Sequence, residues 1–446
     1  MAGAVPAFCS RVDLPRQFVR SSFGAFTVNQ AGSGPAIVQN VFSETDRPVN
    51  SLTKAARPGL TLILWGTGLG PVSGNEAGGP LPGPIQSDAE VFVGGKRASV
   101  IYKGRSGCCA GLDQIVFEVP ADVEGCYVPV AVKTGDVVSN FTTISVARTG
   151  EVCSDTNGVS AEDLKLAQQT GTYRAGHISL SRISTKISLP GTGTIDSKTD
   201  SGSAGFVKFD LDKLVKSQGV FGSAVSMGAC TVYTYRGEEL GNIDPIKPEN
   251  LDAGPVLTLV GPKGTKQLVR QDGGYYAKLG GGTTGLPSVP GVPATPVEPD
   301  FLEPGDYAVD NGSGGSGPNA VGAFRTTLTI PALLKWENEA SVTSVNRSQG
   351  QTVTWSGGDP NGMVTILGGS SSGNTGAGFV CIERTSAGQF TVPPVVLLTL
   401  PASGSENDFG LLSVVGSAGQ KKFTATGLDA GYFDASAGSS KTVSYR

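Results

Sequence analysis

The sequence predicts an all-β protein built from two or three antiparallel, immunoglobulin-like β-sandwich domains with minimal helix. The 446 residues include 65 glycines and 28 prolines, whereas charged residues make up only 16%. This composition favours strands and turns over helices. Apolar and polar residues alternate in short segments bounded by Gly, Pro, Asn and Asp, as in sandwich strands. The one helical pattern covers residues 160–169, where Ser160 and Asp163 form a capping box.

Alternating segments supply strands along most of the chain. In residues 113–119, Ile115, Phe117 and Val119 share one face while polar residues occupy the other, which is typical of a half-buried strand. The expected strands of the first 150 residues are 61–65, 90–93, 113–119, 127–133 and 141–147. Those expected further on are 183–189, 230–235, 256–260, 275–279, 307–309, 324–330, 341–345, 351–355, 364–367, 379–382, 395–400, 422–426 and 442–445.

The pattern of strands and breaks predicts five regions. They are an N-terminal arm (1–31), a sandwich domain (32–150), a helical connector (151–170), a β-rich domain (171–331) and a second sandwich domain (332–446). In residues 286–300 a proline recurs at every third position, which matches the turn of polyproline II. We interpret this segment as a stiff surface connector, with recognition by an aromatic groove as the alternative.

Several motifs of the first domain occur in a recognisable order. They are GSGPAIVQN (32–40), VNSLTKAARPG (49–59), LWGTGLGPV (64–72), AGLDQIVFEVP (110–120), GCYVPVAV (125–132) and VSNFTTISVA (138–147). Together they resemble an uncharacterised immunoglobulin-like domain common in secreted acidobacterial proteins, and the residues after it resemble a β-rich companion region. The resemblance covers residues 32–150 and implies secretion and a β-sandwich. It implies no catalytic residues.

Charge and cysteine usage restrict the partners and the compartment. A net charge of −4 without basic clusters argues against nucleic acid, and no apolar run reaches the ~20 residues of a membrane helix. Seven cysteines without CxxC spacing favour an oxidising compartment. The first residues, MAGAVPAFCSR, lack the features of a signal peptide. We therefore expect a secreted or cell-surface protein whose signal peptide has been removed.

Strand order predicts two disulfides. If strands 113–119 and 127–133 form a hairpin and strand 141–147 turns back along it, Cys126 and Cys153 meet at one end. Cys230 and Cys381 are the remaining strand cysteines and would join the second and third domains. Cys108 and Cys109 would then lie ~30 Å from Cys126, so two alternatives stay open. Either Cys9 bonds to one of them or the two neighbours bond to each other.

Candidate binding residues are few. Trp336, Trp355, Tyr275 and Tyr276 are candidate carbohydrate contacts, although core positions are favoured. No cofactor or metal site is predicted. A structural calcium ion is the one exception considered, and its candidate ligands are Asp210, Asp212, Asp306 and Asp310. Solvated loop carboxylates are the favoured interpretation of these four residues.

The sequence gives no reason to assign a catalytic site. The single histidine, His177, begins an expected strand and is interpreted as a partly exposed edge residue. The segment 369–373 formally fits G-x-S-x-G but lacks the helix that a nucleophile elbow needs.

The resulting hypothesis is a secreted, non-enzymatic structural or adhesive protein that contacts other extracellular proteins, itself or glycans. Residues 23–30 of the arm, FGAFTVNQ, resemble a strand that adds either to their own domain or to a neighbouring subunit. Addition to a neighbour would produce a filament. The alternative function is a carbohydrate-binding accessory of polysaccharide degradation.

Overall fold

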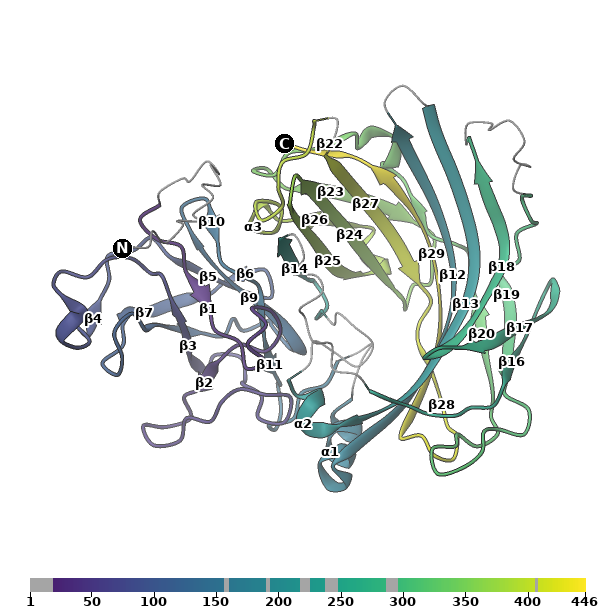
Figure 1. The fold of residues 1–446 in the computed structure, drawn as a ribbon, viewed down its shortest axis with the longest axis horizontal. Helices are drawn as coiled ribbons and strands as arrows, with labels where there is room; N and C mark the ends of the chain where they lie inside the picture. The colour runs from purple at the N-terminus through teal and green to yellow at the C-terminus, as the bar shows by residue number, and fades with distance from the viewer. Residues whose placement is uncertain are drawn as a thin grey trace, which may run out of the picture.

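The computed structural model describes residues 19–155, 160–189, 193–216, 225–236, 248–285, 296–405 and 408–446. The chain is all-β, as predicted. Figure 1 shows an N-terminal sandwich beside a larger, curved sheet that the rest of the chain forms. Within the described residues, none of the helices is long and apolar enough to cross a membrane.

Two sheets form the N-terminal domain. The first has the order β1-β3-β8-β7-β4, with β2 paired to β3, and the second has the order β10-β9-β5-β6, with β11 paired to β9. Apolar side chains such as Leu64, Phe117, Val91 and Val130 fill the space between them. The strands are β1 (Gly24–Ala25), β2 (Val38–Asn40), β3 (Thr61–Thr67), β4 (Gly83–Pro84), β5 (Glu90–Val93), β6 (Lys96–Arg97), β7 (Ser99–Arg105), β8 (Asp113–Glu118), β9 (Gly125–Thr134), β10 (Val137–Val138) and β11 (Thr142–Val146), with a 3-10 turn, η1 (Glu76–Gly78), after β3.

The expected hairpin between strands 113–119 and 127–133 is not formed. β8 pairs with β3 and β7, whereas β9 pairs with β5, β10 and β11 in the opposite sheet. The residues between β8 and β9 therefore carry the chain from one sheet to the other. A short connection between two alternating strands is compatible with either arrangement, so the sequence pattern alone could not separate them.

The segment 23–30 packs on its own domain. β1 pairs with the end of β3, and Thr27 bridges to Ala36. The side chains of Phe23 and Ala25 are buried in the sandwich core. The segment therefore packs as an extra strand on its own domain, which is the first of the two alternatives that the sequence leaves open. Residues 1–18 of the arm lie outside the described residues.

The connector contains the predicted helix. α1 (Ala161–Thr170) begins after Ser160, whose side chain accepts a hydrogen bond from the Asp163 amide, while the Asp163 carboxylate accepts one from the Ser160 amide. This reciprocal pair is the predicted capping box. The helix ends at Gly171, which adopts the left-handed conformation. Leu164 and Ala167 face the buried junction between the N-terminal domain and the large sheet.

A single sheet dominates the rest of the chain. Among the described residues it has fourteen strands, with the order β14-β25-β24-β27-β29-β12-β13-β18-β17-β16-β19-β20, plus β15 on β13 and β28 on β29. Its strands are β12 (Thr172–Leu189), β13 (Gly193–Asp210), β14 (Ala229–Arg236), β15 (Glu249–Asn250), β16 (Val256–Gly261), β17 (Gly264–Gln271), β18 (Gly274–Thr284), β19 (Gly305–Asp310), β20 (Arg325–Ile330), β24 (Met363–Ser372), β25 (Thr375–Arg384), β27 (Phe409–Ser417), β28 (Lys421–Phe423) and β29 (Ala430–Thr442).

Smaller elements complete this part of the chain. A three-stranded sheet consists of β21 (Lys335–Trp336), β23 (Gln351–Ser356) and β26 (Gln389–Val392), and β22 (Ser344–Val345) pairs with β30 (Ser444–Tyr445). The short helical segments are α2 (Leu211–Leu214), α3 (Pro394–Leu397), η3 (Glu339–Ser341) and η4 (Thr385–Ala387).

The ranges 171–331 and 332–446 were expected to be separate domains, but their strands share this sheet. β29, from the second range, lies between β27 and β12 and joins the two ranges by hydrogen bonds. Two apolar clusters lie along the sheet. One fills the space between β24, β25, β27 and the three-stranded sheet, and the other lies inside the curl that brings β20 against β29.

Two kinds of difference separate the expected strands from the observed ones. Residues 395–400 were expected to be a strand, but Pro394 occupies the first turn of α3, a position that suits proline. Conversely, β13, β27 and most of β29 were not expected. Their many Gly and Ser residues obscure the alternation, although Ala204, Phe206, Leu412 and Phe433 do face the core.

Candidate functional site

The pairing of β12 with β29 is the feature that organises the large sheet. The two strands are parallel and in register from Ala175 opposite Ala430 to Lys186 opposite Lys441. All other pairings of this sheet within the described residues are antiparallel. We refer to residues 175–186 and 430–441 as the β12–β29 seam. β12 follows the N-terminal domain and its connector, and β29 comes late in the sequence.

Backbone and side-chain hydrogen bonds fasten the seam where β12 begins. The Arg174 amide donates to Asp429 Oδ2 at 2.7 Å, and the Asp429 amide donates to the Arg174 carbonyl at 2.8 Å. The Arg174 guanidinium also donates to the Gly427 carbonyl at 2.6 Å. The residues just before β29 are therefore held against β12 before the ladder begins.

His177 and Glu339 cross the seam further along. His177 Nε2 lies 2.6 Å from Asp434 Oδ2, and both side chains are partly buried. Glu339, in η3, pairs with Lys186 of β12 at 3.4 Å, while its side chain and carbonyl accept hydrogen bonds from Ser439 and Lys441 of β29. His177 is partly exposed, as expected, but it lies on a central strand and not at an edge.

The connector helix is attached to the same strand pair. Tyr432 of β29 donates to Asp163 Oδ2 at 3.1 Å and lies beside Tyr173 of β12. Burial raises the pKa of Tyr432 to about 12, so its hydroxyl remains a neutral donor. Burial alone would raise the pKa of Asp163 as well, but hydrogen bonds from Ser160 and the nearby Lys422 lower it overall. Asp163 thus caps α1 and anchors it to β29 as a carboxylate.

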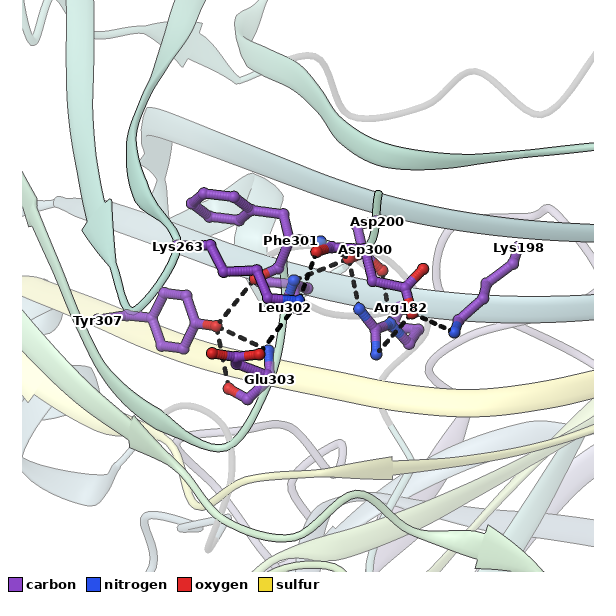
Figure 2. A network of polar contacts seen from close by, with 9 residues as sticks. All are labelled: Arg182, Lys198, Asp200, Lys263, Asp300, Phe301, Leu302, Glu303 and Tyr307. Carbon is purple, nitrogen blue, oxygen red and sulfur yellow. Dashed lines mark hydrogen bonds and ion pairs between the residues drawn. The ribbon is translucent and has the colours of Figure 1, made fainter. Parts of the chain in front are cut away.

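A buried ion pair fastens β12 to β13 on the opposite side from β29. Arg182 donates two hydrogen bonds of 2.6 Å to the Asp200 carboxylate, which is completely buried. The amides of Phe301 and Leu302 each donate to Asp200 Oδ2 at 2.7 Å (Figure 2). Burial opposes ionisation of Asp200, but these donors outweigh it and lower its pKa. One carboxylate therefore joins two strands and a third segment.

The third segment, residues 296–303, includes the end of the proline-rich stretch 286–300. Figure 2 shows Asp300 beside Arg182 and Lys198, and Tyr307 hydrogen-bonded to the backbone of Glu303. Glu298 exchanges two backbone hydrogen bonds of 3.1 Å with Gly281 of β18. The neighbouring Gly280 must lack a side chain there, because a Cβ would collide with the Pro299 carbonyl. Residues 286–295 of the polyproline prediction lie outside the described residues.

Three disulfides occur in the described residues. Cys126 bonds to Cys153 and Cys230 bonds to Cys381, the two pairings that the sequence predicts, and Cys108 bonds to Cys109. Cys126 and Cys153 meet because β11, and not β8, runs back beside β9. Cys230 and Cys381 are direct partners on the neighbouring strands β14 and β25. Cys9 lies outside the described residues.

The candidate carbohydrate contacts do not form an exposed row. Trp336, Trp355 and Tyr275 are only 4–5% exposed. The two indoles belong to the core under the three-stranded sheet, where Trp355 shares a face with Val353. Tyr276 is exposed, because it neighbours Tyr275 on β18 and therefore points to the other face of the sheet.

The candidate calcium ligands are dispersed. Asp210 pairs with Lys213, Asp306 accepts a hydrogen bond from Thr329, and Asp310 lies near Arg325. Asp212 is exposed in α2. In the described part of the chain, no group of three or more His, Cys, Asp or Glu side chains is placed to hold a metal ion. The serines of residues 369–373 lie at the end of β24, next to a turn into β25.

Asp155 lies at the junction of the N-terminal domain and the large sheet, and we expect it to make the free energy of unfolding depend on pH. Its carboxylate accepts a hydrogen bond from the Cys126 amide at 2.9 Å, but burial raises its pKa to about 6. A raised pKa in the folded state favours folding at low pH, and this contribution is lost as the pH rises through about 6. We expect Asp155→Asn to raise the free energy of unfolding by about 1–3 kcal/mol near neutral pH and to have little effect below the ordinary carboxyl pKa.

Urea unfolding of both proteins across this pH range measures the Asp155 effect. Glu151→Gln is the control, because Glu151 is an exposed carboxylate in the same connector. A difference between wild type and Asp155→Asn that stays constant with pH would contradict the prediction.

Comparisons with known proteins add little. No family model and no curated protein matches the sequence. The solved structures that align with it include a titin I-band fragment, I67–I69 (5% identity, 89% of this chain and 96% of the other, TM-score 0.13). Others are the chicken CNTN1 FN1–FN3 domains (8%, 90% and 96%, 0.15) and a biofilm-associated protein BSP domain (10%, 95% and 67%, 0.13). At these TM-scores the alignments carry no argument about function.

Proposed function

We propose that this chain is an extracellular, non-enzymatic structural or adhesive protein that bears tension along its length. The β12–β29 seam carries this proposal, because it joins the strand that leaves the N-terminal domain to a strand late in the sequence. Tension entering through the N-terminal domain pulls β12 at its start. Tension leaving beyond β29 first loads the two-residue β22–β30 pair and then pulls β29 at its end. In parallel neighbours these pulls oppose each other along the strand axis.

The direction of loading decides how strongly the seam resists. When two strands are pulled along their axis, all the hydrogen bonds between them must stretch together, whereas bonds in a peeled hairpin break one at a time. The side-chain contacts of Arg174, His177 and Glu339 add resistance in the same direction. The N-terminal domain has a smaller parallel contact of the same kind, where Pro35 and Ala56 bridge to Thr143 and Val146.

The disulfides support the extracellular part of the proposal. Three bridges in one chain are typical of proteins that fold in an oxidising compartment. Two of these bridges are buried in the cores. We propose that other extracellular proteins, or further copies of this chain, are the partners through which tension is applied.

Single-molecule stretching of the full chain from both ends tests the proposal. We expect the large sheet to resist until one sharp rupture, because the seam must fail before the strands behind it are loaded. The Cys230–Cys381 bridge should then retain its loop, which has a sequence separation of 151. In a reducing buffer the force of this rupture should be unchanged, because the bridge is buried until then. An additional extension of about 500 Å should follow it.

A matched pair of proline variants locates the resistance. Ser179→Pro interrupts β12 within the seam, and Thr327→Pro interrupts β20, whose one strand partner among the described residues is β19. The first variant should rupture at a lower force, and the second should keep the wild-type force. Gradual extension of the wild-type sheet without a distinct rupture would refute the proposal, as would equal rupture forces for the two variants.

A further inference from the structure

Cys108 and Cys109 differ from the other paired cysteines in their surroundings. Both lie exposed in the loop between β7 and β8. The sulfurs of the other two bridges belong to residues that are at most 4% exposed. A thiolate must reach a disulfide sulfur to open it, and exposed disulfides are accordingly the labile ones.

Other interactions hold the ends of this loop together. The Ser106 amide donates to the Leu112 carbonyl at 2.8 Å, and Thr67 Oγ1 donates to the Gly111 carbonyl at 2.8 Å. Just below them, Arg105 forms a buried ion pair with Asp113. The Arg105 guanidinium also lies 2.9 Å from Glu76. Opening the Cys108–Cys109 bond leaves all these contacts in place, so the domain does not have to unfold for the bond to react.

The bridge also adds little to the stability of the fold. A disulfide stabilises a protein mainly by restricting the unfolded chain, and the effect grows with the length of the loop that it closes. Cys108 and Cys109 are adjacent, whereas the other bridges have sequence separations of 27 and 151. Reduction of the adjacent pair therefore has a low cost to folding.

We propose that the Cys108–Cys109 bridge is a thiol–disulfide exchange site, where a thiol-bearing partner becomes covalently and reversibly attached. The partner's thiolate attacks one of the two sulfurs and forms a new S–S bond with it. The Cys108–Cys109 bond breaks in the same step, and the second sulfur leaves as a thiolate that takes a proton from water. One disulfide is exchanged for another, so no oxidant is required. The freed neighbour can later expel the partner and restore the bridge.

The attacking thiol has two possible sources. One is a small molecule such as glutathione, and the other is a cysteine of a second copy of this chain. The sequence contains seven cysteines, of which six form the three bridges of the described residues. The seventh is Cys9. This inference is independent of the proposed tension-bearing role.

Brief exposure of the folded chain to millimolar glutathione tests the site. Free thiols are then blocked with N-ethylmaleimide, and the chain is cleaved after Arg105 and Glu118 to separate the pair from Cys126. We expect glutathione and maleimide on Cys108 and Cys109 at least about tenfold faster than on the four buried cysteines. Equal rates for all three bridges would refute the proposal. So would an unreactive pair, or one of its members bonded to Cys9 of the same chain.

Variants identify the source of the thiol. The Cys9→Ser variant must still form the glutathione adduct. If the adduct were lost, the reactive group would be Cys9, and the proposal would be wrong. Without glutathione, covalent dimers that disappear both in Cys9→Ser and in C108S/C109S would identify the second copy as the source, because a Cys9–Cys9 link would survive the double variant. A wholly monomeric chain that still forms the adduct would identify small thiols. The double variant C108S/C109S should form no adduct and melt within about 2 °C of wild type. Failure of this variant to fold would contradict the argument that the bridge is dispensable.

Discussion

Replacing Asp200 with asparagine is expected to lower the free energy of unfolding by about 3–5 kcal/mol. The carboxylate accepts two hydrogen bonds from Arg182 and two from the Phe301 and Leu302 amides in a site without solvent access. Asparagine removes the negative charge and leaves the Arg182 guanidinium without its charge partner. Removing one member of a buried ion pair costs far more than the pair itself contributes.

The pH dependence and a neighbouring variant make this result specific. The pKa of Asp200 is lowered in the folded state, so its contribution is present above the ordinary carboxyl pKa and is lost only as the pH falls through the lowered value. Urea unfolding should therefore show a constant difference between the two proteins from mildly acidic to neutral pH. Lys198→Ala removes a half-exposed partner of Asp300 and should cost less than about 1 kcal/mol. Equal effects of the two variants would contradict the prediction.

Removing the Cys230–Cys381 bridge with the double variant C230A/C381A is expected to cost about 5 kcal/mol in the chain-entropy model. The large effect follows from the sequence separation of 151 between the two cysteines. The variant C126A/C153A, whose bridge has a separation of 27, should cost about 3–4 kcal/mol in the same model. All four cysteines are at most 4% exposed, so the side-chain cavities that the variants create are comparable.

Chemical denaturation of the wild type and both variants measures the two costs. The order of the effects is the test, because the cavity contribution is common to both. If C126A/C153A lost more free energy of unfolding than C230A/C381A, contacts at the domain junction would outweigh loop entropy, and the prediction would be wrong.

Local patterns account for the parts of the fold that the sequence could predict. Ile115 and Phe117 share the apolar face of an alternating segment that forms β8, and the capping box at Ser160 begins α1. Both features depend on neighbours within one strand or one helical turn. The buried positions of Trp336 and Trp355 were the favoured interpretation for the same reason, since an alternating strand that carries a tryptophan needs no ligand to explain it.

The candidate site could not be predicted, because its contacts join residues far apart in the sequence. His177 contacts Asp434, and Arg174 contacts Asp429. In each pair one residue lies near the beginning and the other near the end of the chain segment that forms the large sheet. β29 itself is rich in Ala, Gly and Ser, so its alternation is weak. Nothing in residues 171–331 indicates that their first strand is completed by a partner from residues 430–441. Because this pairing could not be foreseen, residues 171–331 and 332–446 were expected to form two separate domains.

The position of β29 also sets the order in which the molecule can be made. β12 leaves the ribosome long before its partner, since Ala175 must wait for Ala430. At 5–20 residues per second, this interval is about 10–50 s. During that time the edge of β12 that faces β29 offers unpaired backbone groups to any other extended chain. Long-range parallel pairing is slow to form. We therefore expect this edge to need protection during biosynthesis, and a chain that stops before residue 430 to keep the edge open.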